Sequence, residues 1–373
     1  MKAKLLTTIG LCAFTTSSFA LINIGEGQID MKVTGSVMHD SRITAQSGAP
    51  EDTIFSLTTA FTYVRKSPRF DLQATAGIRI DEYMDNSQFN DENVFFDLAI
   101  NPEAEIRTSR IRFSGNLILN SDTRSNEDIG GIITTNEYGV NGQLVYDPNR
   151  HYTVVFDGST RVIDPDGGTY SRTRDTSAGL RVELPVNKQM AGFGGVRFTQ
   201  HLFDGDTGVD SDSMAYFVGA NGTLFSRMNG SLSVGLQERS LDDGPNSTAP
   251  YVAASLTWAQ SERTQVELTA NNSFSTTLNE YNTEVMRVGA NLTHKLNRLW
   301  SLGGNIGFSD TSYESGILPD RSDEEYYAGM QVNRKVGDWG QVGVSLRYSD
   351  RSSDVDEFSY SRLRVGATVS GKW

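Results

Sequence analysis

The chain has 373 residues, a formal net charge of −13 at pH 7, 37% hydrophobic residues and one cysteine. Because nucleic-acid binding needs a basic surface, this acidic balance excludes nucleic acid as a partner. Beyond the first twenty residues, no stretch is apolar for long enough to form a membrane-spanning helix. The modest hydrophobic share, with 36 glycines and only 9 prolines, favours strands that have one wet face over a large soluble core.

The first twenty residues have the pattern of a cleaved secretory signal. Lys2 and Lys4 precede an apolar segment at 5–14, and Ser18-Phe19-Ala20 forms a small-x-small cleavage site. We therefore predict cleavage near Ala20, which leaves 21–373 as a single domain. Its charge is −15, because the two lysines are lost from a chain of −13, and it has no cysteine.

The remaining chain alternates apolar and polar residues in segments of about ten. Between 70 and 81, for example, Phe, Leu, Ala, Ala, Ile and Ile take the even positions, and Asp, Gln, Thr, Gly, Arg and Asp take the odd ones. A period of two is typical of a strand with one apolar face. We count eighteen such strands, with sixteen as the main alternative. They lie near 29–43, 53–64, 70–83, 93–101, 107–121, 136–146, 151–162, 174–184, 190–202, 213–224, 231–240, 250–258, 265–275, 283–294, 300–310, 324–333, 341–350 and 358–373.

The connections between these segments are alternately short and long. Eight have roughly four to seven residues, whereas others, such as 122–135, 204–212 and 311–323, are longer and rich in Asp, Gly, Ser and Asn. Short turns at one rim, long loops at the other and an even strand number are typical of outer-membrane barrels. We therefore predict an all-β fold, a transmembrane antiparallel up-and-down β-barrel in the outer membrane of a Gram-negative bacterium. Outer-membrane lipid and lipopolysaccharide would surround it.

Two further patterns agree with a barrel. All four tryptophans, Trp258, Trp300, Trp339 and Trp373, fall beside connections that we predict to be short or at the C-terminus, as expected for aromatic residues at a lipid–water interface. The last segment, from Leu363, places Leu, Val, Ala, Val, Gly and Trp on one face and Arg, Gly, Thr, Ser and Lys on the other. It is typical of a closing strand between lipid and a wet lumen.

Strand parity directs many charged side chains into the lumen, with an excess of arginine. Either these charges select which solutes pass, or they form ion pairs that fasten adjacent strands and fill the interior. The predicted lumen-lining residues are Arg79, Arg110, Arg112, Arg161, Arg181, Arg197, Arg287, Arg347, Arg364, Asp71, Asp97, Asp157 and Glu183. The inward positions include few aromatic residues, which argues against a tight sugar-binding lumen.

Metal binding and catalysis find little support in the residues. Asp204, Asp206, Asp210 and Asp212 alternate in one predicted loop and form a weak candidate for a calcium site, but no closing glutamate follows, and a solvated acidic loop is favoured. Of the four histidines, only His201 is predicted to point inward near the long loops. We find no nucleophile and base that the pattern brings together, so we expect no enzyme activity and no cofactor.

Motifs near both ends of the chain resemble the putative β-barrel porin 2 family. Val37-Met38-His39-Asp40-Ser41-Arg42-Ile43 is similar to the Tyr-Asp-Ser-Asn-Ile opening of that family, with His39 and Arg42 in place of Tyr and Asn. Tyr83-Met84-Asp85-Asn86-Ser87 resembles the same motif, and Tyr360-Ser361-Arg362-Leu363-Arg364-Val365-Gly366 resembles the Tyr-x-Arg-x-Arg-Val-Gly ending. The chain ends in Trp373 where Phe is commoner.

This resemblance implies a function as well as a fold. Members of the family are often associated with exopolysaccharide loci, which implies a conduit for a sugar polymer that works with periplasmic export machinery, and the family has no agreed catalytic residues. The sequence thus predicts a passive conduit. A general diffusion porin for small solutes and a structural or surface-binding barrel with a filled lumen are the alternatives.

Overall fold

The computed structural model describes residues 22–67, 70–100, 110–149, 151–168, 170–205, 208–242, 244, 246–315 and 319–373. The predicted signal segment lies outside these residues. The strands of the described part are β1 (Ile22–Ile24), β2 (Gly27–Asp40), β3 (Asp52–Arg65), β4 (Leu72–Tyr83), β5 (Asp91–Ile100), β6 (Ile111–Asn126), β7 (Gly131–Tyr146), β8 (Thr153–Pro165), β9 (Arg172–Pro185), β10 (Met190–Asp204), β11 (Ser211–Phe225), β12 (Met228–Leu241), β13 (Ser247–Ala259), β14 (Thr264–Thr276), β15 (Asn282–Lys295), β16 (Trp300–Glu314), β17 (Arg321–Val336), β18 (Gly340–Ser353) and β19 (Tyr360–Lys372). Two short 3-10 helices, η1 (Ser87–Phe89) and η2 (Asp356–Phe358), interrupt the loops.

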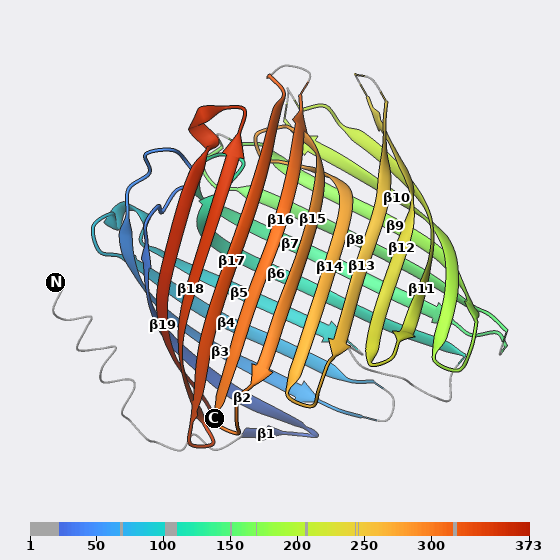
Figure 1. Cartoon of the computed structure of the whole chain (residues 1–373), viewed down its shortest axis with the longest axis horizontal. Coiled ribbons are helices and arrows are strands. Elements are labelled where there is room, and N and C mark those ends of the chain that lie inside the picture. Colours follow the sequence, from blue (N-terminus) through green and yellow to red (C-terminus); the bar gives the residue numbers. More distant parts are fainter. Residues whose placement is uncertain are drawn as a thin grey trace.

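Strands β2 to β19 form one closed antiparallel barrel. Each strand pairs with the next along the chain, and β19 pairs with β2 to close the ring. Figure 1 shows the blue-to-green strands behind and the yellow-to-red strands in front, enclosing a single lumen. The predicted up-and-down barrel of eighteen strands is therefore confirmed over its sixteen-stranded rival. None of the helices in the described part of the chain is long and apolar enough to span a membrane.

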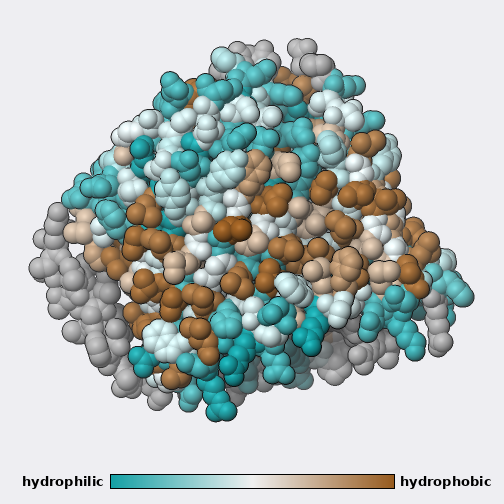
Figure 2. All heavy atoms as spheres, in the orientation of Figure 1, coloured by the Kyte–Doolittle hydropathy of each residue, from teal (hydrophilic) through white to brown (hydrophobic). Residues whose placement is uncertain are grey.

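The outer face of the barrel is apolar because the strands alternate as predicted. On β19, Leu363, Val365 and Val369 are exposed on the outside, whereas Arg362 and Arg364 on the opposite face are buried or half-buried. Figure 2 shows apolar side chains gathered in a band, with polar side chains above and below it. A band of exposed aliphatic residues costs free energy in water and is stable only where lipid covers it.

The seam between β19 and β2 closes the barrel with both backbone and side-chain bonds. Its register runs from Arg364 opposite Asp40 to Lys372 opposite Lys32, and Trp373 and Met31 exchange two backbone hydrogen bonds of 2.9 Å. At the other end, the fully buried Asp40 carboxylate accepts hydrogen bonds from Arg362 at 2.6 Å and from Arg364 at 3.2 Å. The family-like opening and closing motifs thus meet at this seam.

The first residues of β2, which β19 does not pair with, have another partner. The three-residue strand β1 pairs with β2 from Ile22 opposite Ile29 to Ile24 opposite Gly27. An unpaired strand edge exposes backbone N–H and C=O groups, so this short hairpin covers the part of β2 that β19 is too short to reach.

The four tryptophans lie at the rim that carries the short turns. Trp258 is the second-last residue of β13, Trp300 begins β16, and Trp339 lies in the turn between β17 and β18. The Trp339 and Trp373 rings stack with their centroids 5.9 Å apart. Three of the four are exposed by more than a third, as a residue at a lipid–water interface should be.

One predicted loop is wrong. The sequence places a long connection at 122–135, but β6 continues to Asn126 and β7 begins at Gly131, so only 127–130 forms the turn. The polar run from Ser121 resembles a loop because neither face of it is apolar. A strand that stands in water on both sides has no need of an apolar face.

The buried charge at the seam should stabilise the barrel strongly. We expect Asp40→Ala to lower the free energy of unfolding by about 3–5 kcal/mol, because two guanidinium groups lose their partner in a buried site. Denaturant titration of the detergent-solubilised barrel measures this change. Asp30→Ala is the matched control, since Asp30 pairs at 2.8 Å with the largely exposed Lys372 on the same two strands and should cost about 1 kcal/mol or less. Equal costs for the two variants would contradict this interpretation of the seam.

Candidate functional site: the constricted lumen

The outer part of the β6–β7 hairpin leaves the barrel wall. β6 pairs with β5 only from Gly115 opposite Ile100 to Asn120 opposite Phe95, although its pairing with β7 continues to Asn126. Past Asn120, a side chain replaces the backbone pairing between β5 and β6: the Asn93 amide oxygen accepts a hydrogen bond of 2.9 Å from the Thr123 backbone N–H. The end of the hairpin is therefore free to bend into the lumen.

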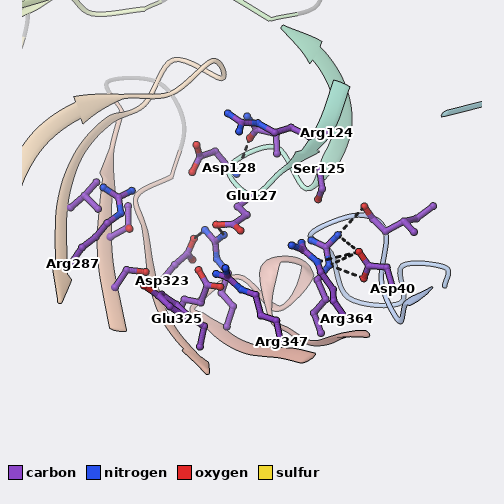
Figure 3. Close-up of a pocket in the computed structure, with 18 of the residues that line it drawn as sticks. Asp40, Arg124, Ser125, Glu127, Asp128, Arg287, Asp323, Glu325, Arg347 and Arg364 are labelled. Carbon is purple, nitrogen blue, oxygen red and sulfur yellow. Dashed lines mark hydrogen bonds and ion pairs between the residues drawn. The ribbon is translucent and has the colours of Figure 1, made fainter. Parts of the chain in front are cut away.

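The tip of this hairpin, residues 127–130, docks on the opposite wall. The Tyr313 hydroxyl on β16 donates a hydrogen bond of 2.7 Å to the Asp128 carboxylate. The Asp128 carbonyl accepts bonds from Asn279 at 3.1 Å and from Arg321 on β17 at 3.3 Å. Glu127 lies 3.7 Å from Arg351 on β18. Figure 3 shows Glu127 and Asp128 projecting between the walls, so the hairpin crosses the lumen.

Two further loops fold over the same region. In the β2–β3 loop, Ile43 and Ala45 are buried, and Gln46 donates a hydrogen bond of 3.0 Å to Glu357 while its side chain lies against Gly130 of the tip. In the β14–β15 loop, the Leu278 carbonyl accepts a bond of 3.0 Å from Ser171. The hairpin tip therefore contacts both the β2–β3 loop, through Gln46, and the β14–β15 loop, through Asn279. Together these three segments narrow the mouth of the barrel.

Between the hairpin tip and the wall lies a chamber of about 880 Å³. Strands β2 to β4 and β14 to β19 provide most of its wall. Its charged groups are mixed in sign, with an excess of one arginine: Arg79, Arg124, Arg287, Arg347, Arg351, Arg362 and Arg364 against Asp40, Asp81, Glu127, Asp128, Asp323 and Glu325. Figure 3 shows Arg287 on one side of the tip and Asp40 with Arg364 on the other.

Most of the arginines that the sequence directs inward form ion pairs. Arg79 contacts both Asp81, at 2.7 Å, and Asp122. The other pairs are Arg112–Asp147 at 2.7 Å, Arg161–Glu137 at 2.6 Å, Arg181–Glu183 at 2.8 Å, Arg197–Asp157 at 2.9 Å and Arg364–Asp40 at 3.2 Å. For these six arginines, the interpretation as fasteners between or along strands holds, and their charge is largely compensated within the wall.

The other predicted lumen residues fall into three groups. Arg110 and Asp71 lie just before β6 and β4, at the rim with the short turns, and the Asp71 carboxylate there accepts a bond of 3.0 Å from the Ser67 N–H. Asp97 accepts a bond of 3.3 Å from Asn116 within the wall. Arg287 and Arg347 line the chamber, are exposed, and have no ion pair with any acid in the described residues.

Inward aromatic residues are more numerous than the sequence suggested. Phe193, Phe217 and Tyr251 form a row along β10, β11 and β13, with centroid separations of 6.2 and 5.1 Å. Each ring lies over or beside a glycine of a neighbouring strand, as do Phe95 over Gly77 and Tyr327 over Gly307. Phe193 and Tyr251 are buried and Phe217 is half-buried, so most of the ring surface of this row packs within the wall. These contacts depend on cross-strand register, which no local sequence pattern reveals.

Three of the four aspartates of the weak metal candidate lie in the described part of the chain. Asp210 accepts a bond of 2.8 Å from the Phe203 N–H, Asp204 lies 3.6 Å from Arg172, Asp212 belongs to β11, and Asp206 lies outside the described residues. The described residues contain no group of three or more potential metal ligands. His201 is buried and pairs with Asp175 at 2.6 Å.

The chain is similar to a known protein family in sequence and to solved structures in fold. The family model described as putative beta-barrel porin 2 matches residues 22–373. Among solved structures, the outer membrane protein OpdK of Pseudomonas aeruginosa is 9% identical with a TM-score of 0.50, over 94% of this chain and 100% of that one. OccK9 (OpdG) of the same organism is 10% identical, also with a TM-score of 0.50, over 94% and 99%.

A third solved structure, a bacterial polysaccharide outer membrane secretin, is 12% identical with a TM-score of 0.37, over 92% of this chain and 98% of that one. None of the curated proteins compared with the chain matches it. At 9% and 10% identity, the two Pseudomonas aeruginosa structures show a shared barrel fold. The family match and this fold identify an outer-membrane β-barrel of porin type.

The docked hairpin should respond to pH through Asp128. Burial raises the pKa of this carboxyl above its ordinary value, although Tyr313 and Arg351 oppose the shift. The docked tip therefore binds the proton more tightly than a released tip. Docking is strongest at low pH and weakens as pH rises through the raised pKa.

We expect brief high-conductance events in planar bilayers to be rarer at pH 5 than at pH 8. Asp128→Asn, a neutral residue of the same shape, should keep the low-pH behaviour at both values. If Asp128→Asn retains the full pH dependence, another group must control the hairpin.

Proposed function

The chain belongs to the putative beta-barrel porin 2 family, and from that membership and the geometry of the lumen we propose that it is a passive diffusion channel for small polar solutes. The proposal includes export by the segment 1–20 and its removal near Ala20. The barrel then lies in the outer membrane, with its short turns toward the periplasm.

The observation that carries this proposal is the hairpin tip bound across the lumen. A chamber of about 880 Å³ beside the tip is comparable in size to sites that hold one small molecule. Its wall of hydroxyl, amide and charged groups suits hydrated solutes. Because positive and negative charges are nearly balanced there, selectivity between small cations and anions should be weak.

A conduit for exopolysaccharide is the second candidate, and it requires more of the structure. A polymer chain would have to displace the tip together with the loops at 41–51 and 277–281, which are joined to it through Gln46 and Asn279. Periplasmic export machinery could supply the energy for such a displacement. A barrel with a filled lumen is the third possibility.

Solute flux into liposomes distinguishes the three candidates. For the purified barrel we expect swelling in galactose and in disaccharides, steady conductance in potassium chloride, and no entry of dextran. Barrel-free liposomes treated with the same detergent are the control. Entry of dextran through the intact barrel would favour the polysaccharide conduit, and the absence of both swelling and conductance would favour a filled lumen.

A further inference from the structure

We propose that Arg287, Tyr327 and Arg347 form a subsite for the carboxylate of a small hydroxylated solute, such as a sugar acid. This inference rests on the proposed channel function and specifies the class of solute that the channel prefers.

Most of the arginines around the chamber have their charge compensated by a carboxylate. Five of these arginines are held by carboxylates: Arg79 by Asp81, Arg124 by Asp122 at 3.4 Å, Arg351 by Asp323, and both Arg362 and Arg364 by Asp40. Arg287 and Arg347 are the exceptions within the described lining. Both guanidinium groups are exposed to the chamber, so each retains donors that a soluble anion can bind.

Tyr327 on β17 lies between the two arginines. It pairs with Gly307 on β16, and Gly307 pairs with Gly289 on β15. A side chain at Gly307 would overlap the Tyr327 ring, and a Cβ at Gly289 would lie 3.4 Å from its hydroxyl. The ring therefore lies flat across β16 and brings its hydroxyl to β15, two residues along the same inward face from Arg287.

Tyr327 also orients the second arginine. The Arg347 guanidinium lies over the Tyr327 ring, 4.6 Å from its centroid, which is the geometry of a cation–π contact. The contact fixes the plane of the guanidinium and leaves its edge N–H groups open to the chamber. Two glycines thus make room for one ring that links Arg347 to the strand of Arg287. Figure 3 shows both arginines projecting into the chamber.

The neighbouring groups suit a solute that carries hydroxyl groups as well as a carboxylate. Thr269, Asn271 and Ser309, on β14 and β16, line the same wall and can bond hydroxyl groups of a solute. The nearest acid on β17 is Glu325, which pairs across the strands with Arg351 and also lies in the field of Arg347. Arg347 itself lies opposite Gly329, so no acid faces it in the β17–β18 register.

Galacturonate and galactose test the proposal because they differ only at the carboxylate. We expect galacturonate to interrupt the potassium chloride current through single wild-type channels, and galactose at equal concentration to leave it unchanged. Arg287→Gln and Arg347→Gln should each weaken the blockade roughly 10- to 100-fold, since each removes a charge-assisted contact. Gly307→Ala, which displaces the Tyr327 ring, should weaken it while retaining both arginines.

The matched control is Arg112→Gln, which removes one positive charge at the short-turn rim, where Arg112 pairs with Asp147. It should change the galacturonate blockade by less than about twofold, since it lies outside the subsite. A conducting channel with no galacturonate blockade, with equal blockade by galactose, or with equal weakening in Arg112→Gln would overturn the subsite while leaving the channel function in place. A barrel without conductance would overturn the channel function itself.

Discussion

Closure of the backbone hydrogen bonds at the β19–β2 seam is the constraint on which the rest of this structure depends. Within lipid, no water is available for an unpaired N–H or C=O group, so the two chain ends must meet in register. The backbone bonds between Trp373 and Met31 close one end of the seam, and the buried Asp40 with Arg362 and Arg364 closes the other. The family-like motifs at 37–43 and 360–366 supply Asp40, Arg362 and Arg364 and so make the second of these closures, which gives the resemblance a physical basis.

Closure also makes the inward hairpin possible. A wall already completed by seventeen other strand pairings can release β6 from β5 above Asn120, where the Asn93 side chain accepts a hydrogen bond from the freed Thr123 N–H. The tip of the released hairpin then exchanges hydrogen bonds with water for hydrogen bonds with Tyr313 and Arg321 on the opposite wall. The narrow part of the lumen is therefore a property of polar side chains and their partners, whereas the barrel around it is a property of backbone pairing and lipid contact.

Much of the fold can be predicted from the sequence because the pattern of each barrel strand is contained in a short stretch of residues. The period of two, the alternation of short and long connections and the tryptophans beside the short turns each lie within a dozen residues, and they predict the number and direction of the strands. The site does not follow in this way. Asp122 lies 43 residues from Arg79, and Asp40 lies 324 residues from Arg364, so these pairs exist only once the register is set. The contacts between aromatic rings and glycines cannot be predicted from the sequence for the same reason. The polar end of the β6–β7 hairpin resembles a loop in the sequence because it has no lipid-facing side and therefore no alternation of apolar and polar residues.

The most direct test of this account is the single-channel conductance of a barrel whose β6–β7 hairpin has been shortened. Replacing residues 122–135 with a two-residue Asn-Gly turn between Ser121 and Asn136, which face each other across the two strands, removes the part that crosses the lumen. Heat-modifiable migration on a gel would verify that the shortened barrel still folds. We predict a severalfold increase in conductance and admission of larger sugars. An unchanged conductance in the folded, shortened barrel would contradict it, since the bore would then be set elsewhere.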